Sequence, residues 1–285
     1  MTSAPAPGSV LLVTGASSGI GLAPAVAAAQ AGFIVVARVR DPDRAAALTE
    51  AATAAGVDID VRKLDVTDPE SVVRCVDGVL SSYGRLDALV NNAGAAHVGT
   101  VETDSMEAIR ATLEVNFFGV VAMTHATMPH LRASGGRLVT ISSVGGIVGQ
   151  PFNEAYCAAK FAVEGFMESL APVAATVGVK VTVVEPGAVA SSFVANAGLE
   201  RDRMVADAGP YGPALAGYLA RAAGAFASAQ TSESAAEVVV ATLTDDSPPF
   251  RVQTSDTARA FVGVKLADLD GSVVQGLTRS WVAAG

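Results

Sequence analysis

The most constraining feature of this 285-residue chain is an apolar run that leads directly into a glycine-rich turn and an alanine-rich segment. The run Val10-Leu11-Leu12-Val13 is short and continuous, which is typical of a buried parallel strand. Residues 22–31 predict a helix, in which we expect Pro24 to be tolerated only in the first turn. The turn between them is Thr14-Gly15-Ala16-Ser17-Ser18-Gly19-Ile20-Gly21. In this order the three segments predict a dinucleotide site, because glycines let the backbone approach a pyrophosphate on the helix N-terminus.

Apolar runs and helical patterns alternate along most of the remaining chain. Further strands are predicted at residues 33–39, 59–64, 86–90, 137–141, 179–184 and 250–253. Helices are predicted from Asp41-Pro42 onward and at residues 69–82, 105–128, 153–177 and 231–243. This alternation predicts one α/β domain over residues 1–285, with a doubly wound (Rossmann-type), mostly parallel sheet of seven strands and helices on both faces. Residues 191–230 are interpreted as a small helical insert over the pocket, and residues 254–285 as a weakly patterned C-terminal tail.

The composition narrows the class of protein. Lys and Arg number 19 against 28 Asp and Glu, and the net charge of −9 argues against binding to nucleic acid or to an anionic membrane. No apolar run is long enough to span a bilayer, and the first nine residues lack the charged n-region of a signal peptide. The two cysteines, Cys75 and Cys157, lie on unrelated segments, so we expect neither a disulfide framework nor a metal site, and a reducing, cytoplasmic location.

Several residues with a possible binding role directly follow predicted strands. They are Gly15, Asp65, Asn91, Ser143 and Pro186. The carboxyl ends of parallel strands share one edge of the sheet, and ligands of such sheets bind there. We therefore expect these residues to line one site.

Tyr156 and Lys160 carry the candidate chemistry. They are four residues apart, so on a helix both side chains leave from one face. A free phenol has a pKa near ~10, and a fixed ammonium close by favours the phenolate and lowers that pKa. A tyrosine tuned in this way exchanges a proton with an alcohol or carbonyl oxygen. Ser143 follows the strand at residues 137–141, from which its hydroxyl could reach the same oxygen.

Taken together, these residues resemble the short-chain dehydrogenase/reductase family. The matching pieces are Thr14–Gly21, Asp65, Asn91-Asn92-Ala93-Gly94, Asn116, Ser143, Tyr156-x-x-x-Lys160 and Pro186-Gly187. The glycine spacing, Gly15-x-x-x-Gly19-x-Gly21, differs from the Gly-x-Gly-x-x-Gly of most other dehydrogenases. Residues 142–146 and 151–165 are similar to the branch that contains 17β-hydroxysteroid dehydrogenase type 1 and photoreceptor retinol dehydrogenase.

This resemblance implies an NAD(P)-dependent oxidoreductase that interconverts an alcohol and its ketone or aldehyde. It implies Tyr156 as the acid/base, Lys160 as the group that lowers the pKa of Tyr156 and holds the nicotinamide ribose, Ser143 as a partner of the substrate oxygen, and Asn116 as the holder of a relay water. Cofactor contacts are implied at Gly15, Ser17, Ser18, Gly19, Ile20, Gly21, Arg38, Arg40, Asp65, Val66, Asn92, Ala93, Gly94, Tyr156, Lys160, Pro186, Gly187, Val189 and Ser191. Substrate contacts are expected at Ser143, Val144, Gly149, Phe152, Tyr156 and Phe193.

The choice of cofactor and substrate rests on fewer residues. NAD-preferring members of the family carry an acidic side chain at the end of the second strand, where this chain has Arg38 and Arg40. Since guanidinium suits a 2′-phosphate, we expect NADP(H) to be favoured over NAD(H), with Asp41 serving as a helix cap. The apolar pocket residues favour a lipophilic substrate such as a steroid or retinoid. Arg221 and Ser280 stand where the estrogen-converting enzymes carry a His and a Glu, so estrogens are expected to be poor substrates.

Other readings remain open at this level. A ketoreductase for polyketide-like or acyl carbonyls would use the same catalytic residues. A non-catalytic dinucleotide-sensing protein would not need all four residues of the catalytic set, and the glycine pattern disfavours an isomerase or dehydratase of the extended branch. The two long helices at residues 105–128 and 153–177 resemble those that pair across two-fold axes in the family, which predicts a homodimer or homotetramer.

Overall fold

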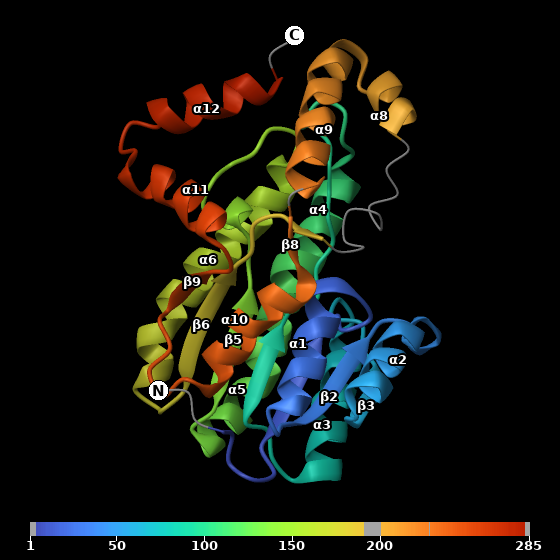
Figure 1. The fold of residues 1–285 in the computed structure, drawn as a ribbon, viewed down its shortest axis with the longest axis vertical. Coiled ribbons are helices and arrows are strands. Elements are labelled where there is room, and N and C mark those ends of the chain that lie inside the picture. Colours follow the sequence, from blue (N-terminus) through green and yellow to red (C-terminus); the bar gives the residue numbers. More distant parts are fainter. Residues whose placement is uncertain (1–3, 191–200, 228, 283–285) are drawn as a thin grey trace.

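A seven-stranded parallel sheet forms the centre of the molecule (Figure 1). The structure is a computed structural model, and it describes residues 4–190, 201–227 and 229–282. The strand order is β3-β2-β1-β4-β5-β6-β9, which is the doubly wound arrangement predicted from the sequence. The strands are β1 (Val10–Thr14), β2 (Ile34–Val39), β3 (Ile59–Lys63), β4 (Ala88–Asn91), β5 (Arg137–Ile141), β6 (Lys180–Glu185) and β9 (Arg251–Gln253). All seven predicted strands are therefore confirmed, with bounds that differ by one or two residues.

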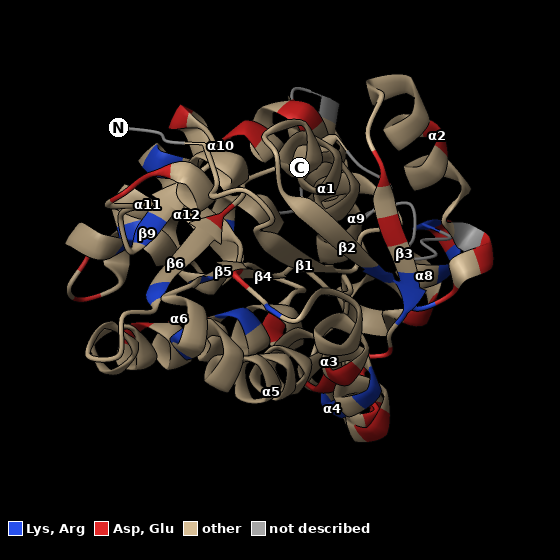
Figure 2. Ribbon diagram, turned by 90° about the horizontal axis from the view of Figure 1, so that it is seen from below, with Lys and Arg blue, Asp and Glu red and all other residues tan. Residues whose placement is uncertain are grey.

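Helices cover both faces of this sheet, as Figure 2 shows from below. On one face lie α1 (Gly19–Gln30), α2 (Ala46–Ala55) and α10 (Ser232–Thr244), which share an apolar core with alternate residues of β1 and β2. On the other face lie α3 (Pro69–Tyr83), α5 (Gly119–Ser134) and α6 (Glu154–Ala175), packed on a second core. The inner strands β1, β4, β5 and β6 are buried on both sides, which explains their continuous Val- and Leu-rich runs, whereas the edge strands β3 and β9 are half-buried.

Two details of the helices differ from the sequence-based expectation. The first helix begins at Gly19, so Pro24 lies in its second turn and is buried there. The single helix predicted over residues 105–128 is instead α4 (Met106–Leu113), a π-helical segment (Glu114–Phe118) and α5. Single π-helical turns often lie at functional sites, and this one contains Asn116.

The C-terminal part of the chain is more ordered than its sequence pattern suggested. Residues 254–285, interpreted from the sequence as a weakly patterned C-terminal tail, contain two helices, α11 (Asp256–Ala267) and α12 (Ser272–Val282). The insert contains α8 (Arg201–Asp207), a 3₁₀ turn (Gly209–Tyr211) and α9 (Gly212–Ala227), flanked by the short pair β7 (Val189–Ala190) and β8 (Gln230–Thr231). Figure 1 places α8, α9, α11 and α12 together at one end of the molecule.

A small apolar cluster joins this end of the molecule to the start of α6. It contains Phe152, Ala208, Leu215, Tyr218 and Trp281. Burial of this cluster explains why α12 is helical, since Val274, Thr278 and Trp281 recur on one face and are buried. Among the described residues, no helix has both the length and the apolar character needed to cross a membrane.

Candidate active site

The glycine turn after β1 is packed tightly against the end of β4. A side chain at Gly15 would place its Cβ 2.7 Å from the Cα of Ala93, and one at Gly21 would lie 2.3 Å from Nδ2 of Asn92. Gly15 and Gly19 also have positive φ angles, of 67° and 56°. Nδ2 of Asn92 donates hydrogen bonds to the backbone oxygens of Thr14 and Gly15 at 3.0 and 2.9 Å. The glycines and Asn92 thus hold the turn in place through contacts within the protein itself.

The first turn of α1 is suited to an anion. Ser18 is the N-cap residue, yet its hydroxyl caps no backbone N–H, and the first turn contains no acidic residue. The first backbone N–H groups of a helix lack intrahelical partners and carry partial positive charge. Ser17, Ser18, Gly19 and Ile20 are half-buried here. This arrangement fits the pyrophosphate of a dinucleotide, as the glycine spacing predicted.

Arg38 and Arg40, which were predicted to act together, have different surroundings at the end of β2. Arg38 is 3% exposed, and its Nη2 donates a hydrogen bond to the backbone oxygen of Cys75 on α3 at 2.9 Å. Desolvation by burial lowers the pKa of this guanidinium. Arg40 is exposed at the strand end. Of the two arginines predicted to contact a 2′-phosphate, only Arg40 is exposed at the surface.

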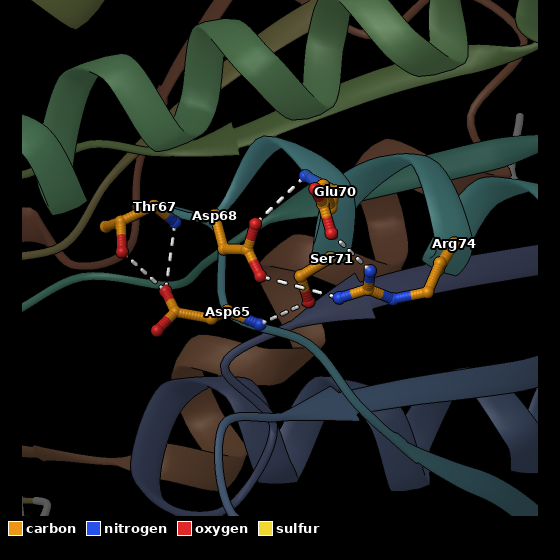
Figure 3. Close-up of polar contacts among 6 residues, drawn as sticks. All are labelled: Asp65, Thr67, Asp68, Glu70, Ser71 and Arg74. Carbon is orange, nitrogen blue, oxygen red and sulfur yellow. Dashed lines mark hydrogen bonds and ion pairs between the residues drawn. The ribbon is translucent and has the colours of Figure 1, made fainter.

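Asp65, which was expected to meet the adenine, organises the turn into α3 (Figure 3). Its Oδ1 accepts hydrogen bonds from the backbone N–H of Thr67 at 2.9 Å and from the Thr67 hydroxyl at 2.7 Å. These bonds lower the pKa of Asp65. Its backbone N–H donates to the hydroxyl of Ser71 at 3.0 Å, and Asp68 caps α3 through the N–H of Glu70. Val66 is buried next to this turn.

A polar cavity of about 310 Å³ lies between this turn and the end of β2. Its polar lining residues include Arg38, Lys63, Asp65, Ser71 and Arg74. Arg74 forms ion pairs with Asp68 at 3.5 Å and Glu70 at 3.0 Å, so part of the basic charge is neutralised (Figure 3). The cavity therefore offers both donors and acceptors at the cofactor-binding edge.

Ser143 and Tyr156 lie next to each other, where β5 has ended and α6 begins. Ser143 caps a 3₁₀ turn (Val144–Gly146), and its hydroxyl accepts a hydrogen bond from the backbone N–H of Gly145 at 3.0 Å. The same hydroxyl is hydrogen-bonded to the phenol of Tyr156. A Cβ at Gly145 would lie 3.3 Å from the Ser143 hydroxyl and 3.4 Å from the Tyr156 ring. Gly145 thus leaves room for both side chains on one side of the turn.

The pKa of Tyr156 differs from the sequence-based expectation. Desolvation by burial raises it to about 12, and the hydrogen bond from Ser143 opposes that rise. Lys160, which was expected to lower this pKa, has its Nζ 5.9 Å from the centre of the tyrosine ring. Burial is therefore the main influence on the pKa of Tyr156, and the phenol stays protonated at neutral pH.

Lys160 is buried, with 4% of its surface exposed. Its Nζ donates a hydrogen bond to the backbone oxygen of Ile141 at 3.0 Å. Burial lowers the pKa of Lys160 to about 8, and attraction to Glu164 opposes this shift. The ammonium therefore stands close to the point at which a small change in its surroundings alters its charge.

Asn116 connects the π-helical segment to the strand-end loop after β4. Its Oδ1 accepts from the N–H of Ala95 at 3.2 Å, and its Nδ2 donates to the oxygens of Ala95 and Thr112 at 3.0 and 2.9 Å. A Cβ at Gly94 would lie 2.9 Å from Asn116 Oδ1 and 3.8 Å from Lys160 Nζ. The predicted neighbourhood of Gly94, Asn116 and Lys160 is present, and the amide of Asn116 holds the loop in place.

The side of the site expected to meet substrate begins at Phe152. This residue has φ of +58°, the one left-handed conformation outside glycine among the described residues. Its ring lies 5.8 Å from that of Tyr218 on α9, whose hydroxyl accepts a hydrogen bond from Asn153 at 2.5 Å. Gly149 is exposed and Val144 is half-buried. Pro186 joins the site through its backbone oxygen, which accepts from the N–H of Val144 at 3.0 Å.

The remaining predicted residues follow β6. Gly187 is half-buried, and Val189 is buried in β7. Ser191 and Phe193 lie outside the residues that the structure describes. One residue of the site was not singled out from the sequence: Glu164, a buried carboxyl group four residues after Lys160 on α6. The spacing Lys160-x-x-x-Glu164 was a signal for it, because residues four apart share a helix face.

A doubly wound sheet, an open helix N-terminus at its carboxyl edge and a Ser-Tyr-Lys group beside it define a dinucleotide-binding oxidoreductase. Residues 9–202 match the family model of the short-chain dehydrogenases. The chain belongs to the short-chain dehydrogenase/reductase family.

Relatives in sequence, of which YusZ is described only as an uncharacterised oxidoreductase, extend the likeness. The chain is 36% identical to retinol dehydrogenase 8 of Bos taurus over 273 residues, which cover 92% of this chain and 86% of that protein. It is 36% identical to human 17-beta-hydroxysteroid dehydrogenase type 1, over 92% of this chain and 82% of the relative. The oxidoreductase YusZ of Bacillus subtilis is 41% identical, over 65% of this chain and 66% of its own length. The branch predicted from the sequence is confirmed.

Solved structures agree with the fold. A short-chain dehydrogenase from Streptomyces avermitilis is 31% identical, with a TM-score of 0.75 over 95% of this chain and 97% of that one. A metagenomic short-chain oxidoreductase in complex with NADP is 33% identical, with a TM-score of 0.61 over 64% of this chain and 83% of that one. An enzyme from Burkholderia phymatum in complex with NAD is 24% identical, with a TM-score of 0.78 over 93% of this chain and 95% of its own, and shows the fold alone.

Proposed function

We propose that this protein is an NADP(H)-dependent oxidoreductase that interconverts a lipophilic alcohol and its ketone or aldehyde. The observation that carries the proposal is the hydrogen-bonded pair of Ser143 and Tyr156, with buried Lys160 on the same helix face, at the edge where the helix α1 begins. Bound at that edge, a nicotinamide dinucleotide would supply the hydride for the reaction.

The proton chemistry belongs to Tyr156. In the direction of reduction, the phenol donates its proton to the carbonyl oxygen while the carbonyl carbon becomes an alcohol carbon. A raised pKa suits this donor role, because the phenol is fully protonated at neutral pH. Ser143 holds the same substrate oxygen by a second hydrogen bond. The charge of Lys160 favours the phenolate that Tyr156 leaves behind, which lowers the barrier.

The cofactor is held by the groups at the sheet edge. The N–H groups of Gly19, Ile20 and Gly21 and the hydroxyls of Ser17 and Ser18 fit the pyrophosphate, since they face an uncapped helix start. Asn92, Ala93, Gly94, Pro186, Gly187 and Val189 flank the nicotinamide side. Ser191 is proposed there on its hydroxyl alone. Asp65 and Val66 flank the adenine, with the second carboxylate oxygen of Asp65 outside the Thr67 bonds.

The preference for NADP(H) rests on Arg40. Arg40 is exposed at the end of β2, and Asp41 directs its Oδ1 to the N–H of Asp43 at 3.1 Å as a cap of the turn Pro42–Arg44. Asp41 therefore caps this turn and does not act as the acidic residue that receives a ribose diol. The NADP complex of a 33% identical enzyme supports this choice.

The substrate class rests on apolar surroundings. Phe152, Tyr218 and Trp281 form one cluster with half-buried Met204 beside them, and Tyr156 lies four residues from Phe152. Such surroundings suit a bulky lipophilic ligand with few polar anchors. The relatives named for retinol and for 17-beta-hydroxysteroids support steroids or retinoids as the first classes to test.

The test is a screen of purified protein with NADPH and with NADH against lipophilic ketones, retinal and small keto acids. Oxidation of NADPH with a lipophilic carbonyl, abolished by Tyr156→Phe, is the expected result. No cofactor oxidation with any carbonyl, despite measurable binding of NADPH, would favour the alternative of a dinucleotide-sensing protein. Turnover confined to acyl or polyketide-like carbonyls would move the assignment to that class of ketoreductase.

A further inference from the structure

One turn beyond Lys160 on α6 begins a buried group of charged residues with no assigned role. Glu164 is 4% exposed and Glu185 is fully buried, and both contact Arg251. Oε2 of Glu164 accepts hydrogen bonds from Nε and Nη2 of Arg251, each at 3.3 Å, and Oε1 of Glu185 lies 2.7 Å from Nε. Burying two carboxyl groups with one guanidinium is costly unless the arrangement serves another group.

Glu164 occupies the space directly beneath the turn that carries Ser143. A Cβ at Gly146 would lie 3.0 Å from Cγ of Glu164 and 3.2 Å from the backbone oxygen of Lys160. Glu164 also lies one helical turn beyond Lys160 on α6, so the two side chains share a face. Its carboxyl group is thus placed between Lys160, the Ser143 turn and β9.

We propose that Glu164, held by Arg251 of β9, is a positioning residue that keeps Lys160 in its charged form beside Tyr156. This role rests on the proposed function, because it is the ammonium form of Lys160 that favours the Tyr156 phenolate.

The charges around this pair agree with the assignment. The attraction of Glu164 raises the pKa of Lys160 against the effect of burial, which brings it to about 8. Burial raises the pKa of Glu164, while a hydrogen bond with the Ser142 hydroxyl and the charges of Arg251 and Lys160 lower it. The other titratable groups that face the pair are Tyr156 and Glu168 on α6 and Glu185 on β6. Of all these groups, Glu164 is the one whose charge shifts the pKa of Lys160.

Arg251 opposes the effect of burial on Glu164, because its positive charge favours the carboxylate form. Its guanidinium contacts the carboxyl group of Glu164 and also that of Glu185, whose pKa is raised by burial to about 7. Its third partner, Glu168, lies one turn further along α6 and is 65% exposed, at 3.2 Å from Nη2. Glu168 therefore offers a matched control: it has the same chemistry, helix and partner, but lies two turns from Lys160.

The direct test is the ionisation of Lys160 in the cofactor-free protein. The chain has four lysines, so ¹³C-labelled lysine gives a simple NMR spectrum in which Lys160→Met identifies the Lys160 signal. Glu164→Gln keeps the size of the side chain and removes its charge. We expect the Lys160 pKa to fall by roughly one unit in this variant and to stay unchanged in Glu168→Gln.

In the kinetic test, the pH dependence of kcat should shift in the same direction as the pKa of Lys160. If Lys160 must be charged, activity falls as pH rises through its pKa, so a lower pKa moves the alkaline limb of kcat to lower pH. Glu164→Gln should move that limb by the same roughly one unit, with a larger effect on kcat than on KM. Glu164→Asp, which keeps the charge but retracts it by one methylene, should restore part of the shift.

These measurements separate the two proposals. If wild-type protein reduces no carbonyl, the proposed function fails, while the NMR titration still decides on Glu164. An unchanged Lys160 pKa in folded Glu164→Gln, or an equal shift in Glu168→Gln, would overturn the inference even if the enzyme is active. Should Glu164→Gln not fold, Glu164→Asp decides: a lowered Lys160 pKa supports the role, and a pKa equal to that of the wild type refutes it.

Discussion

Arg38 and Arg40 lie two residues apart on the same strand end, and their side chains have opposite surroundings. Arg38 is buried and donates to the backbone oxygen of Cys75 at 2.9 Å, whereas Arg40 is exposed. A guanidinium that is already desolvated and bonded to the protein serves the packing of β2 on α3. An exposed one is available to a phosphate.

The first prediction concerns cofactor selectivity. Arg40→Ala should raise the Kd for NADPH by roughly 10- to 100-fold and leave the Kd for NADH within a few-fold, because charge-assisted hydrogen bonds contribute about 1.5–3 kcal/mol. Arg38→Met should instead lower the melting temperature. Titration by fluorescence measures both affinities. Tighter binding of NADH than of NADPH by the wild-type protein would contradict the assignment.

The second prediction concerns the glycine turn. A Cβ at Gly21 would lie 2.3 Å from both Nδ2 of Asn92 and the backbone oxygen of Gly15, so Gly21→Ala should destabilise the fold by ~1–3 kcal/mol. Gly263 is the control, since it also lies inside a helix but a Cβ there meets nothing within 4 Å. Gly263→Ala should stabilise by ~0.5–1 kcal/mol. Chemical denaturation without cofactor measures both, and equal stability of the two variants would show that the turn tolerates a side chain.

The third prediction concerns the proton donor. Tyr156→Phe keeps the ring but removes the proton, so kcat should fall roughly 10²–10⁴-fold with little change in NADPH affinity. Lys160→Met should reduce both kcat and affinity. Single-turnover kinetics with binding titrations separates the two effects. Near-normal kcat in Tyr156→Phe would exclude the proposed mechanism.

The order of strands and the edge that carries the site could be predicted because each depends on local patterns. Apolar runs mark the strands of a sheet buried on both faces, and residues that follow such strands share one edge. The family motifs then placed Ser143, Tyr156 and Lys160. The Tyr156 pKa could not be predicted in this way, since it depends on burial in the folded chain and on the hydrogen bond with Ser143, which is distant in sequence.

Three other features could not be predicted from the sequence patterns, because they too depend on the surroundings of the residues in the folded chain. The π-helical segment at residues 114–118 has no local signal, because Asn116 is held there by Ala95 from another element. The helix α12 follows a weak pattern, whose buried face is defined by contact with α9 through Trp281 and Leu215. Arg38 and Arg40 look equivalent in the sequence, but Arg38 lies within β2 and is buried against α3, whereas Arg40 follows the last residue of that strand and is exposed.

The fourth prediction concerns assembly. Large apolar side chains are exposed on α4, the π-helical segment and α6: Met106 at 54%, Phe118 at 52% and Phe161 at 41%. These elements contact one another in the monomer, so a second copy could cover them together. We expect a homodimer or homotetramer by light scattering at micromolar concentration, and a monomer for Phe118→Glu combined with Phe161→Glu. A monomeric wild type would refute this proposal.

The last prediction concerns discrimination among steroids. Arg221 lies on α9 with its guanidinium 4.4 Å from the ring centre of Trp281, and the hydroxyl of Ser280 donates to the backbone oxygen of Leu277 at 2.6 Å. Neither position offers a charged acceptor to a phenolic hydroxyl, because Arg221 only donates, and the Ser280 hydroxyl, a neutral acceptor, is exposed and donates to its own helix. Leaving a buried hydroxyl unpaired costs about 1–3 kcal/mol. We therefore expect kcat/KM for estrone to be roughly 10- to 100-fold below that of a steroid ketone of equal size without the phenol. Steady-state rates with NADPH test this, with Ser280→Glu as the variant that should recover part of the estrone activity. Efficient estrone reduction by the wild type, or a preference for a small charged keto acid over every lipophilic ketone, would show that the far end of the pocket is not built from α9 and α12 as proposed.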